Sequence, residues 1–280
     1  MYKIVRKERL NEVTWLFDIE APAVAQKAQP GQFIILRVAE KSERIPLTIY
    51  DYSSDKGTVS IVVQALGKST HQLAEVPENG SILDFVGPLG HSTEIKNFGK
   101  VVCIGGGIGV APIFPIARAL KQAGCEVISI IGARTKDLLI LEDQMKQVSD
   151  RLLVCTDDGT YAKKGFVTQV LQELLDSEKV ARAWAIGPLL MMKAVCDVSR
   201  GYKLKTIVSL NCIMVDGTGM CGSCRVSVDG KTMFACVDGP EFDGHEVNFE
   251  ELTYRQNRFV DKEKCSLEDY RSECQCQAQK

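Results

Sequence analysis

Short runs of apolar residues, several of them alternating with polar ones, recur through the first third of the chain. Turn-forming pairs such as Pro30-Gly31 and Asn79-Gly80 separate the runs, and this pattern predicts β-strands. The strands are expected at residues 3–10, 13–20, 32–38, 45–52, 57–66 and 81–90. Strands in this arrangement predict a small antiparallel β-barrel over residues 1–97, interrupted by one helix at residues 69–76.

The apolar period changes after residue 97, where the patterns of buried strands alternate with those of helices. Strands are predicted at residues 100–109, 126–134, 151–159, 182–188 and 203–210, the last of these closing the sheet. Helices are predicted at residues 111–124, 137–150, 165–177 and 189–201. Pro112 and Pro115 are expected in the first turn of the first helix, and Gly124 at its end. Strands that alternate with helices predict a parallel α/β sheet over residues 98–206.

Residues 207–280 follow neither pattern. They are first rich in Gly and Cys, then acidic, and then polar with a helical stretch at residues 248–259. Because this part has few apolar residues, it is expected to be a small appended module that a bound cofactor holds together. The predicted fold class is therefore α/β plus β, in three parts at residues 1–97, 98–206 and 207–280.

Composition narrows the functional classes. The chain has 280 residues, a net charge of −2 and no basic run, which argues against a nucleic-acid partner. No apolar run approaches the roughly 20 residues that span a bilayer, and the N-terminus lacks the apolar core of a signal peptide. A cytoplasmic location is therefore expected. An odd count of 11 cysteines in a reducing compartment favours thiols, metal ligands or core packing over disulfides.

A glycine-rich segment, residues 103–112 (CIGGGIGVAP), joins the first predicted α/β strand to its helix. Glycines in such a turn let the backbone approach a pyrophosphate, and the helix N-terminus favours the anion. Gly105 and Gly107 match the first two positions of the dinucleotide pattern G-x-G-x-x-G, but Val110 stands in the third. On its own this signal is as compatible with a tight turn as with nucleotide binding.

A second segment, residues 214–226 (MVDGTGMCGSCRV), reads D-x4-C-x2-C from Asp216 through Cys221 to Cys224, and Cys236 follows after 11 residues. This is the spacing of a plant-type [2Fe–2S] loop whose first cysteine is replaced by aspartate, and a carboxylate can also ligate iron. A zinc ribbon or a redox-active dithiol fits the spacing less well. The pattern therefore favours an iron–sulfur site.

Four further cysteines bear on this site or on the tail. Cys212 lies four residues before Asp216 and is an alternative fourth ligand, but C-x8-C-x2-C is not the plant-type spacing, so Asp216 is favoured. Cys265, Cys274 and Cys276 lie in the polar tail, where exposed or weakly ordered thiols are expected.

The motifs GGGIGVAP, GAR, TDDG and IGPLLMM follow one another behind the predicted barrel, and with them the first 205 residues resemble the ferredoxin–NADP reductase superfamily. The segments SLNCIMVDGTGMCGSCRV and FACVDGPEFDGHEV extend the resemblance to the electron-transfer subunits of dihydroorotate dehydrogenase B. The chain resembles more closely the small (alpha) subunits of NADH-dependent reduced ferredoxin:NADP oxidoreductases, also described as sulfide dehydrogenase beta subunits. That group has an aspartate ligand to its cluster.

The resemblance implies FAD in the barrel, NAD(H) rather than NADP(H) on the α/β sheet, and a [2Fe–2S] cluster in the C-terminal part. The residues that it places at the flavin are Arg44, Pro46, Leu47, Thr48, Ile49, Gly67, Lys68, Ser69, Thr70, Gly87, Pro88, Leu89 and Gly90. Those at the nucleotide are Gly107, Gly109, Pro112, Arg134, Asp157, Asp158, Gly187, Pro188 and Met191. The implied metal ligands are Asp216, Cys221, Cys224 and Cys236. Leu47 departs from the family pattern, because a tyrosine commonly precedes the threonine and stacks on the flavin.

The function implied by the resemblance is that of an electron-transfer subunit, which exchanges hydride with NAD(H) at FAD and passes single electrons through the cluster. The implied partner is a larger subunit that resembles the glutamate synthase small subunit and carries flavin and [4Fe–4S] clusters. Together they would form a heterodimeric, electron-bifurcating ferredoxin:NADP oxidoreductase. No catalytic side chain and no membrane is implied. The alternatives are an electron-transfer subunit of another complex (dihydroorotate dehydrogenase B, hydrogenase-type or sulfide dehydrogenase) and a non-catalytic redox sensor.

Overall fold

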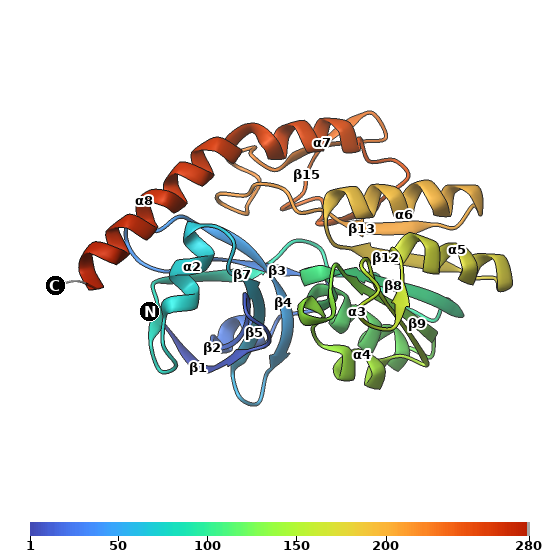
Figure 1. Cartoon of the computed structure of the whole chain (residues 1–280), viewed down its shortest axis with the longest axis horizontal. Coiled ribbons are helices and arrows are strands. Elements are labelled where there is room, and N and C mark those ends of the chain that lie inside the picture. Colours follow the sequence, from blue (N-terminus) through green and yellow to red (C-terminus); the bar gives the residue numbers. More distant parts are fainter. Residues whose placement is uncertain (279–280) are drawn as a thin grey trace.

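The computed structural model describes the backbone of residues 1–278 and the side chains of residues 1–272. Figure 1 shows a β-rich unit on the left, an α/β unit on the right, and a C-terminal segment that runs across the top from the second unit to the first. Among the described residues, no helix combines the length and the apolar character needed to cross a membrane. The boundaries at residues 97 and 206 stay predictions.

An antiparallel, barrel-like sheet forms the N-terminal part, with the strand order β6-β1-β2-β5-β4-β3-β7. Its strands are β1 (Tyr2–Arg9), β2 (Thr14–Glu20), β3 (Phe33–Arg37), β4 (Ile45–Ser53), β5 (Thr58–Gln64), β6 (Ser81–Ile82) and β7 (Asp84–Leu89). The sixth predicted run is divided between two strands, because the Leu83 N–H donates to the carbonyls of Arg37 and Val38. Helix α2 (Lys68–Glu75) was predicted, whereas the short helix α1 (Pro22–Ala25) was not.

The α/β unit is built on parallel strands in the order β10-β9-β8-β12-β13, with a short strand at each edge. The strands are β8 (Lys100–Gly106), β9 (Glu126–Ala133), β10 (Arg151–Thr156), β11 (Lys163–Lys164), β12 (Arg182–Ile186), β13 (Thr206–Ser209) and β16 (Glu241–Asp243). The helical elements are η1 (Gly107–Gly109), α3 (Val110–Gln122), η2 (Lys136–Leu138), α4 (Glu142–Val148), α5 (Val167–Ser177) and α6 (Leu189–Gly201). Helices α3 and α4 cover one face of the sheet, and α5 and α6 cover the other (Figure 1).

Three details of this unit differ from the prediction. Pro115 lies inside α3 rather than in its first turn, where its ring belongs to the buried face of the helix. The helix predicted at residues 137–150 begins only at Glu142, because residues 136–138 form a 3₁₀ turn. Strand β13 does not close the sheet, since β16 from the C-terminal part pairs antiparallel with it.

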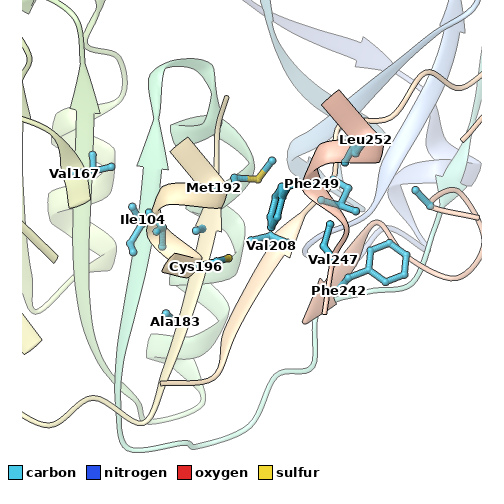
Figure 2. Packing of buried hydrophobic residues seen from close by; sticks show 14 of the residues in the cluster. Ile104, Val167, Ala183, Met192, Cys196, Val208, Phe242, Val247, Phe249 and Leu252 are labelled. Atoms are coloured by element: carbon cyan, nitrogen blue, oxygen red, sulfur yellow. The ribbon is translucent and has the colours of Figure 1, made fainter. Parts of the chain in front are cut away.

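The C-terminal part shares its core with the α/β unit. It contains the hairpin of β14 (Arg225–Val228) and β15 (Lys231–Phe234), followed by β16 and α7 (Phe249–Gln256). Figure 2 shows Phe249 beside Met192 and Val208 of the α/β unit, and all three share one buried cluster with Val247 and Phe242. Apolar packing therefore contributes to holding this part on the sheet, beside what a bound cofactor would contribute.

The polar tail forms a long helix, α8 (Val260–Ala278), which follows the turn η3 (Asn257–Phe259). The helix runs past the barrel beside α2 (Figure 1), and the Tyr270 hydroxyl donates to the Glu75 carboxylate at the end of α2. Cys265 is exposed, as predicted. The predictions for the Cys274 and Cys276 thiols lie outside the described side chains.

Candidate functional site

Three segments that the sequence assigned to the flavin meet at one end of β3. Phe33 pairs with Thr48 on one neighbouring strand and with Leu89 on the other, so residues 46–48 and residues 86–89 flank the same end. The Ser69 hydroxyl at the start of α2 donates to the Glu43 carboxylate (3.4 Å). Because Glu43 directly precedes Arg44, this bond brings the α2 N-terminus close to Arg44. The exposed Arg44 guanidinium and this helix N-terminus together suit a pyrophosphate.

The two faces of β4 divide the predicted flavin residues. The side chain of Ile49 is 1% exposed and lies in the barrel core, and Leu47 packs against the same cluster. Pro46 and Thr48 alternate with these residues and point to the opposite face of the strand. Leu47 and Ile49 can therefore reach a flavin only through their backbone, whereas Thr48 can also offer its hydroxyl.

At the start of α2, Thr70 caps the helix. Its hydroxyl oxygen accepts from the N–H groups of Leu66 and Gly67 (3.0 Å each) and donates to the Gly67 carbonyl (2.9 Å). The Gly67 N–H is thus already used, so the donors left for a phosphate are those of the first helical turn, Lys68 and Ser69. An added Cβ at Gly67 would meet nothing within 4 Å, which leaves the approach to this turn open.

The turn after β7 is held from two sides. The Gln32 side-chain amide donates to the Gly90 carbonyl (2.8 Å), and the His91 N–H donates to the Gly239 carbonyl (2.7 Å). Gly90 has φ +74, and an added Cβ would lie 2.8 Å from both Phe33 and Pro240. The role of Gln32 was missed by sequence reasoning, although the residue stands next to a predicted strand. The turn thereby links the barrel to the segment that follows Cys236.

The nucleotide residues gather where the strand order of the parallel sheet reverses, between β8 and β12. In open α/β sheets this point, at the carboxyl ends of the strands, is where ligands bind. Gly109 packs against the end of β12, because an added Cβ would lie 2.1 Å from the Ile186 carbonyl oxygen. Gly187 follows β12, and a Cβ there would lie 2.8 Å from Met191. The sequence-predicted residues Gly107, Gly109, Gly187 and Met191 are thus brought together, with Pro112 in the first turn of α3.

The next two strand ends carry the remaining nucleotide residues. The N–H groups of Asp157 and Asp158 donate to the carbonyls of Ala133 and Arg134 (3.1 and 3.2 Å). Burial raises the pKa of Asp157, and the nearby Arg134 charge opposes this shift. A hydrogen bond from the Thr160 N–H lowers the pKa of Asp158. These strand ends therefore present one cation and two carboxylates at the edge of the nucleotide site.

The four predicted metal ligands form two pairs. Asp216 Oδ1 lies 3.4 Å from Cys221 Sγ, and the Sγ atoms of Cys224 and Cys236 lie 3.3 Å apart. The first pair is at the surface of the loop, while Cys224 and Cys236 are each 1% exposed. Within the described side chains no three potential metal ligands lie as close as a bound metal requires. The two pairs nevertheless belong to one loop and the strand end beside it.

Asp216 also organises the loop itself. Its carboxylate accepts hydrogen bonds from the N–H groups of Thr218 (3.0 Å) and Cys221 (2.9 Å), which lower its pKa, the Thr218 bond having the largest effect. Burial raises the pKa of Cys221, but hydrogen bonds led by those of Ser223 outweigh it and the net shift is downward. An ionised carboxylate beside an acidified thiol is the state in which both groups ligate a metal.

Cys236 and Cys212 are both buried, and burial shifts the pKa of both thiols in the same direction. Burial raises the pKa of Cys236 to about 12, and the hydrogen bond with Cys224 acts in the same direction. Burial also raises the pKa of Cys212 to about 12. Cys212 is 4% exposed and belongs to the apolar core, whereas Asp216 contacts Cys221 directly. Three thiolates and one carboxylate fit an iron–sulfur cluster as a donor set.

The loop of residues 216–224, called the cluster loop below, rests directly on strands β3 and β7. Gly217 has φ +75, and an added Cβ would lie 2.7 Å from both Ile35 of β3 and Leu89 of β7. Gly219 and Gly222 also have positive φ, which turns the backbone of the loop around the thiols. The cluster loop is therefore in van der Waals contact with Ile35 and Leu89 through Gly217.

A half-buried glutamate lies where the three parts of the chain meet. Glu241 of β16 accepts a hydrogen bond from the Thr93 hydroxyl (2.7 Å), and Thr93 in turn is bound to the Pro30 carbonyl through its N–H. Burial raises the pKa of Glu241 to about 7, although the Thr93 hydroxyl and the Trp184 indole favour the ionised form. Among the described groups, none lies in hydrogen-bonding position with Trp184 Nε1. The Thr93 hydroxyl is therefore the hydrogen-bond donor that the structure defines for the Glu241 carboxylate.

Glu241→Gln is expected to make thermal stability less dependent on pH. The unfolded chain ionises Glu241 near its ordinary value and the folded chain near pH 7. Its contribution is therefore complete below about pH 4.3 and is lost as the pH rises through 7, by on the order of 3 kcal/mol. The melting temperature of the variant relative to the unsubstituted chain should increase between pH 5 and pH 8. A constant difference would contradict the buried-carboxyl interpretation, and Glu250→Gln, an exposed change, serves as the control.

Three segments match known domain families. Residues 1–93 match the oxidoreductase FAD-binding domain, residues 103–197 the oxidoreductase NAD-binding domain, and residues 211–248 the iron–sulfur cluster binding domain of dihydroorotate dehydrogenase B. The three groups of residues described above lie within or beside these segments. The chain is thus an oxidoreductase with FAD-, NAD- and iron–sulfur-binding domains.

Similar proteins cover nearly the whole chain. A Thermotoga maritima protein named an electron transfer subunit homolog of dihydroorotate dehydrogenase B is 48% identical over 268 residues, which are 96% of this chain and 95% of that protein. A probable electron transfer subunit of the same enzyme from Methanocaldococcus jannaschii is 36% identical over 79% of this chain and 81% of that protein. A solved chain of an NADH-dependent reduced ferredoxin–NADP oxidoreductase is 47% identical, with a TM-score of 0.92 over 96% of this chain and 98% of that one. The protein therefore belongs to the family of dihydroorotate dehydrogenase B electron-transfer subunits and their homologues, within the ferredoxin–NADP reductase superfamily.

Proposed function

We propose that this chain is the NAD(H)-oxidising electron-transfer subunit of an electron-bifurcating NADH-dependent ferredoxin:NADP oxidoreductase. The observation that carries the proposal is the contact of the cluster loop with the flavin strands at Gly217, in a chain 47% identical to a chain of such an enzyme. When bound, FAD exchanges hydride with a nicotinamide and single electrons with a [2Fe–2S] cluster. The chain's own residues bind and position these groups.

The segments around β3 would position the flavin. Arg44 and the first turn of α2 would hold the pyrophosphate, and Thr48 with the turn at residues 87–90 would lie along the ring system. This arrangement would orient the flavin between the nucleotide site and the cluster loop. FAD binding follows from the domain family, while the role of each named residue is part of the proposal.

The ends of β8 and β12 would position the nicotinamide nucleotide. Gly107 and Gly109 let the backbone approach a pyrophosphate at the start of α3, and Gly187, Pro188 and Met191 would border the nicotinamide. Asp157 and Asp158 at the next strand end disfavour a 2′-phosphate through charge repulsion, although Arg134 opposes this effect. On this charge balance we propose NAD(H) as the nucleotide.

A surface beside the cluster loop suits a partner subunit. Val215, Met220 and Val237 expose 48%, 86% and 37% of their surface, and they surround the outward-facing pair of Asp216 and Cys221. Exposed apolar groups that gather around a functional site are typical of protein–protein contacts. We propose that the larger flavin- and [4Fe–4S]-containing subunit binds here, as a heterodimer, and connects the chain to ferredoxin.

An anaerobic titration tests the relay. The purified chain is expected to hold about one FAD and about two iron atoms with equal acid-labile sulfide, and NADH is expected to bleach the flavin and give the electron paramagnetic resonance signal of a reduced [2Fe–2S] cluster. NADPH is the control and should react more slowly. Zinc in place of iron, or a flavin that NADH does not reduce, would refute the relay and favour the redox-sensor alternative.

A second candidate is the electron-transfer subunit of dihydroorotate dehydrogenase B itself, favoured by the names of the relatives and by the match of residues 211–248. The two candidates differ in the partner. Purification of the native complex is expected to yield a large subunit with flavin and [4Fe–4S] clusters. A partner that oxidises dihydroorotate, with no further iron–sulfur cluster, would establish the second candidate instead.

A further inference from the structure

A cation on α7 reaches into the cluster loop. Arg255 Nη2 donates to the carbonyl of Ser223, the residue directly before Cys224 (3.3 Å). The next residue, Gln256, donates from its side-chain amide to the Asn211 carbonyl, directly before Cys212. Helix α7 therefore anchors both sides of the cysteine loop, one anchor being charged and the other neutral.

The charge of Arg255 acts on one buried sulfur atom beside the loop, that of Cys212. Its guanidinium lowers the pKa of Cys212, against the larger effect of burial, and Cys212 lies in the same buried cluster as Cys224 and Cys236. Arg255 is itself partly buried, so solvent and salt screen its charge less than that of an exposed side chain such as Arg258. A thiolate cluster gains one negative charge when it is reduced, and a fixed positive charge nearby stabilises that state.

From this geometry we propose that Arg255 sets the reduction potential of the cluster, raising it by holding a positive charge at the Ser223 carbonyl. The proposal rests on the proposed function, because it presumes an iron–sulfur cluster on Asp216, Cys221, Cys224 and Cys236. Arg255 is a positioning and tuning residue, since it contacts the loop backbone rather than a ligand atom. None of the three domain families or the sequence motifs points to it.

The test is a redox titration of the full chain, anaerobically loaded with iron and sulfide and followed by electron paramagnetic resonance. Arg255→Gln keeps an amide donor for the Ser223 carbonyl but removes the charge, so the midpoint potential is expected to shift downward. Arg255→Lys keeps the charge, so its midpoint is expected to stay near that of the unsubstituted chain. Arg258→Gln, which removes an exposed charge at the end of the same helical segment, should leave the midpoint unchanged.

Gln256→Met separates the effect of charge from the effect of anchoring. It removes the neutral anchor at Asn211 and is expected to leave the midpoint unchanged. A Gln256→Met shift equal to that of Arg255→Gln, or an unshifted Arg255→Gln, would overturn the proposal. Should Arg255→Gln fail to retain the cluster, Arg255→Lys decides: a retained cluster with the original midpoint supports the proposal, and a lowered midpoint contradicts it.

Failure of the proposed function looks different from failure of this inference. An unsubstituted chain that binds no iron and acid-labile sulfide would refute the cluster itself, and the role of Arg255 with it. A chain that binds the cluster, is reduced by NADH, and keeps its midpoint in Arg255→Gln would refute only the role of Arg255.

Discussion

Asp216→Ala is expected to lose the iron–sulfur cluster, with iron falling from about two atoms per chain to nearly none while the FAD content stays unchanged. The substitution removes one of four donors and also the acceptor of the Thr218 and Cys221 N–H groups that shape the loop. Colorimetric iron and sulfide assays with the flavin absorbance measure both quantities in one sample. Asp216→Cys supplies a thiolate at the same position and should restore the cluster with an altered magnetic resonance signal.

Cys212→Ala is the matched control for this prediction. Cys212 lies in the apolar core, so its loss should cost about 1 kcal/mol of stability through a small cavity, while iron and sulfide stay at their original level. If Asp216→Ala kept its iron–sulfur cluster and Cys212→Ala lost it, the result would identify Cys212 as the fourth ligand. Loss of the cluster in both variants would mean that the loop does not tolerate substitution, and Asp216→Cys would then identify the ligand position.

Gly109→Ala is expected to raise the KM for NADH by at least about tenfold, which corresponds to about 1.4 kcal/mol of lost binding free energy. The backbone φ of Gly109 is an ordinary −63°, so the cause is a clash and not backbone strain. An added Cβ would lie 2.1 Å from the Ile186 carbonyl oxygen and 2.8 Å from the Gly187 Cα, and both are backbone atoms. The turn at the start of α3 must therefore move away from β12, which distorts the nucleotide site. Steady-state oxidation of NADH with an artificial acceptor measures the effect.

Gly201→Ala makes the same chemical change at the end of α6, where an added Cβ meets nothing within 4 Å. This control is expected to keep the original KM. Because α3 also packs against the barrel, the flavin content and the circular dichroism spectrum of Gly109→Ala must be measured beside its kinetics. An unchanged KM in a folded, flavin-loaded Gly109→Ala variant would show that nucleotide does not bind at this turn.

The architecture was largely predictable, because it depends on patterns that are local in the sequence. Alternating runs marked the strands of the barrel, and the alternation of apolar strands with helices marked the parallel sheet. The position of Gly124 also predicted the end of α3, where it adopts φ +86 after the last helical turn. In each case the residues that determine the element lie within it.

The elements that were missed depend on partners far away in the sequence. Strand β16 has three residues, too few for a pattern, and it exists because β13 offers a free edge. Helix α8 has little apolar character, so no amphipathic period marked it, yet its backbone is helical over residues 260–278. The shared core with the α/β unit was hidden for the same reason, since Phe242, Val247 and Phe249 are scattered singly through a polar segment.

The candidate site was predicted in outline but not in its orientations. The alternation of Ile45, Leu47 and Ile49 already indicated a common face, and the structure places that face in the barrel core. The capping role of Thr70 could have been expected from its position three residues after Gly67. Arg255 and Glu241 carried no sequence signal, because a lone charge in a polar segment is usually solvated and only tertiary contacts reveal its burial.

The common core of the cluster-binding part and the α/β unit has a consequence for recombination between family members. Residues 207–252 cannot be exchanged as a self-contained cassette, because Phe242 and Phe249 fill space beside Met192 and Val208 on the other side of the junction. A chimera would have to carry α6 and β13 along with the cysteine loop in order to keep both surfaces complementary. Inheritance of the cluster and of the nucleotide-binding sheet is therefore expected to be coupled.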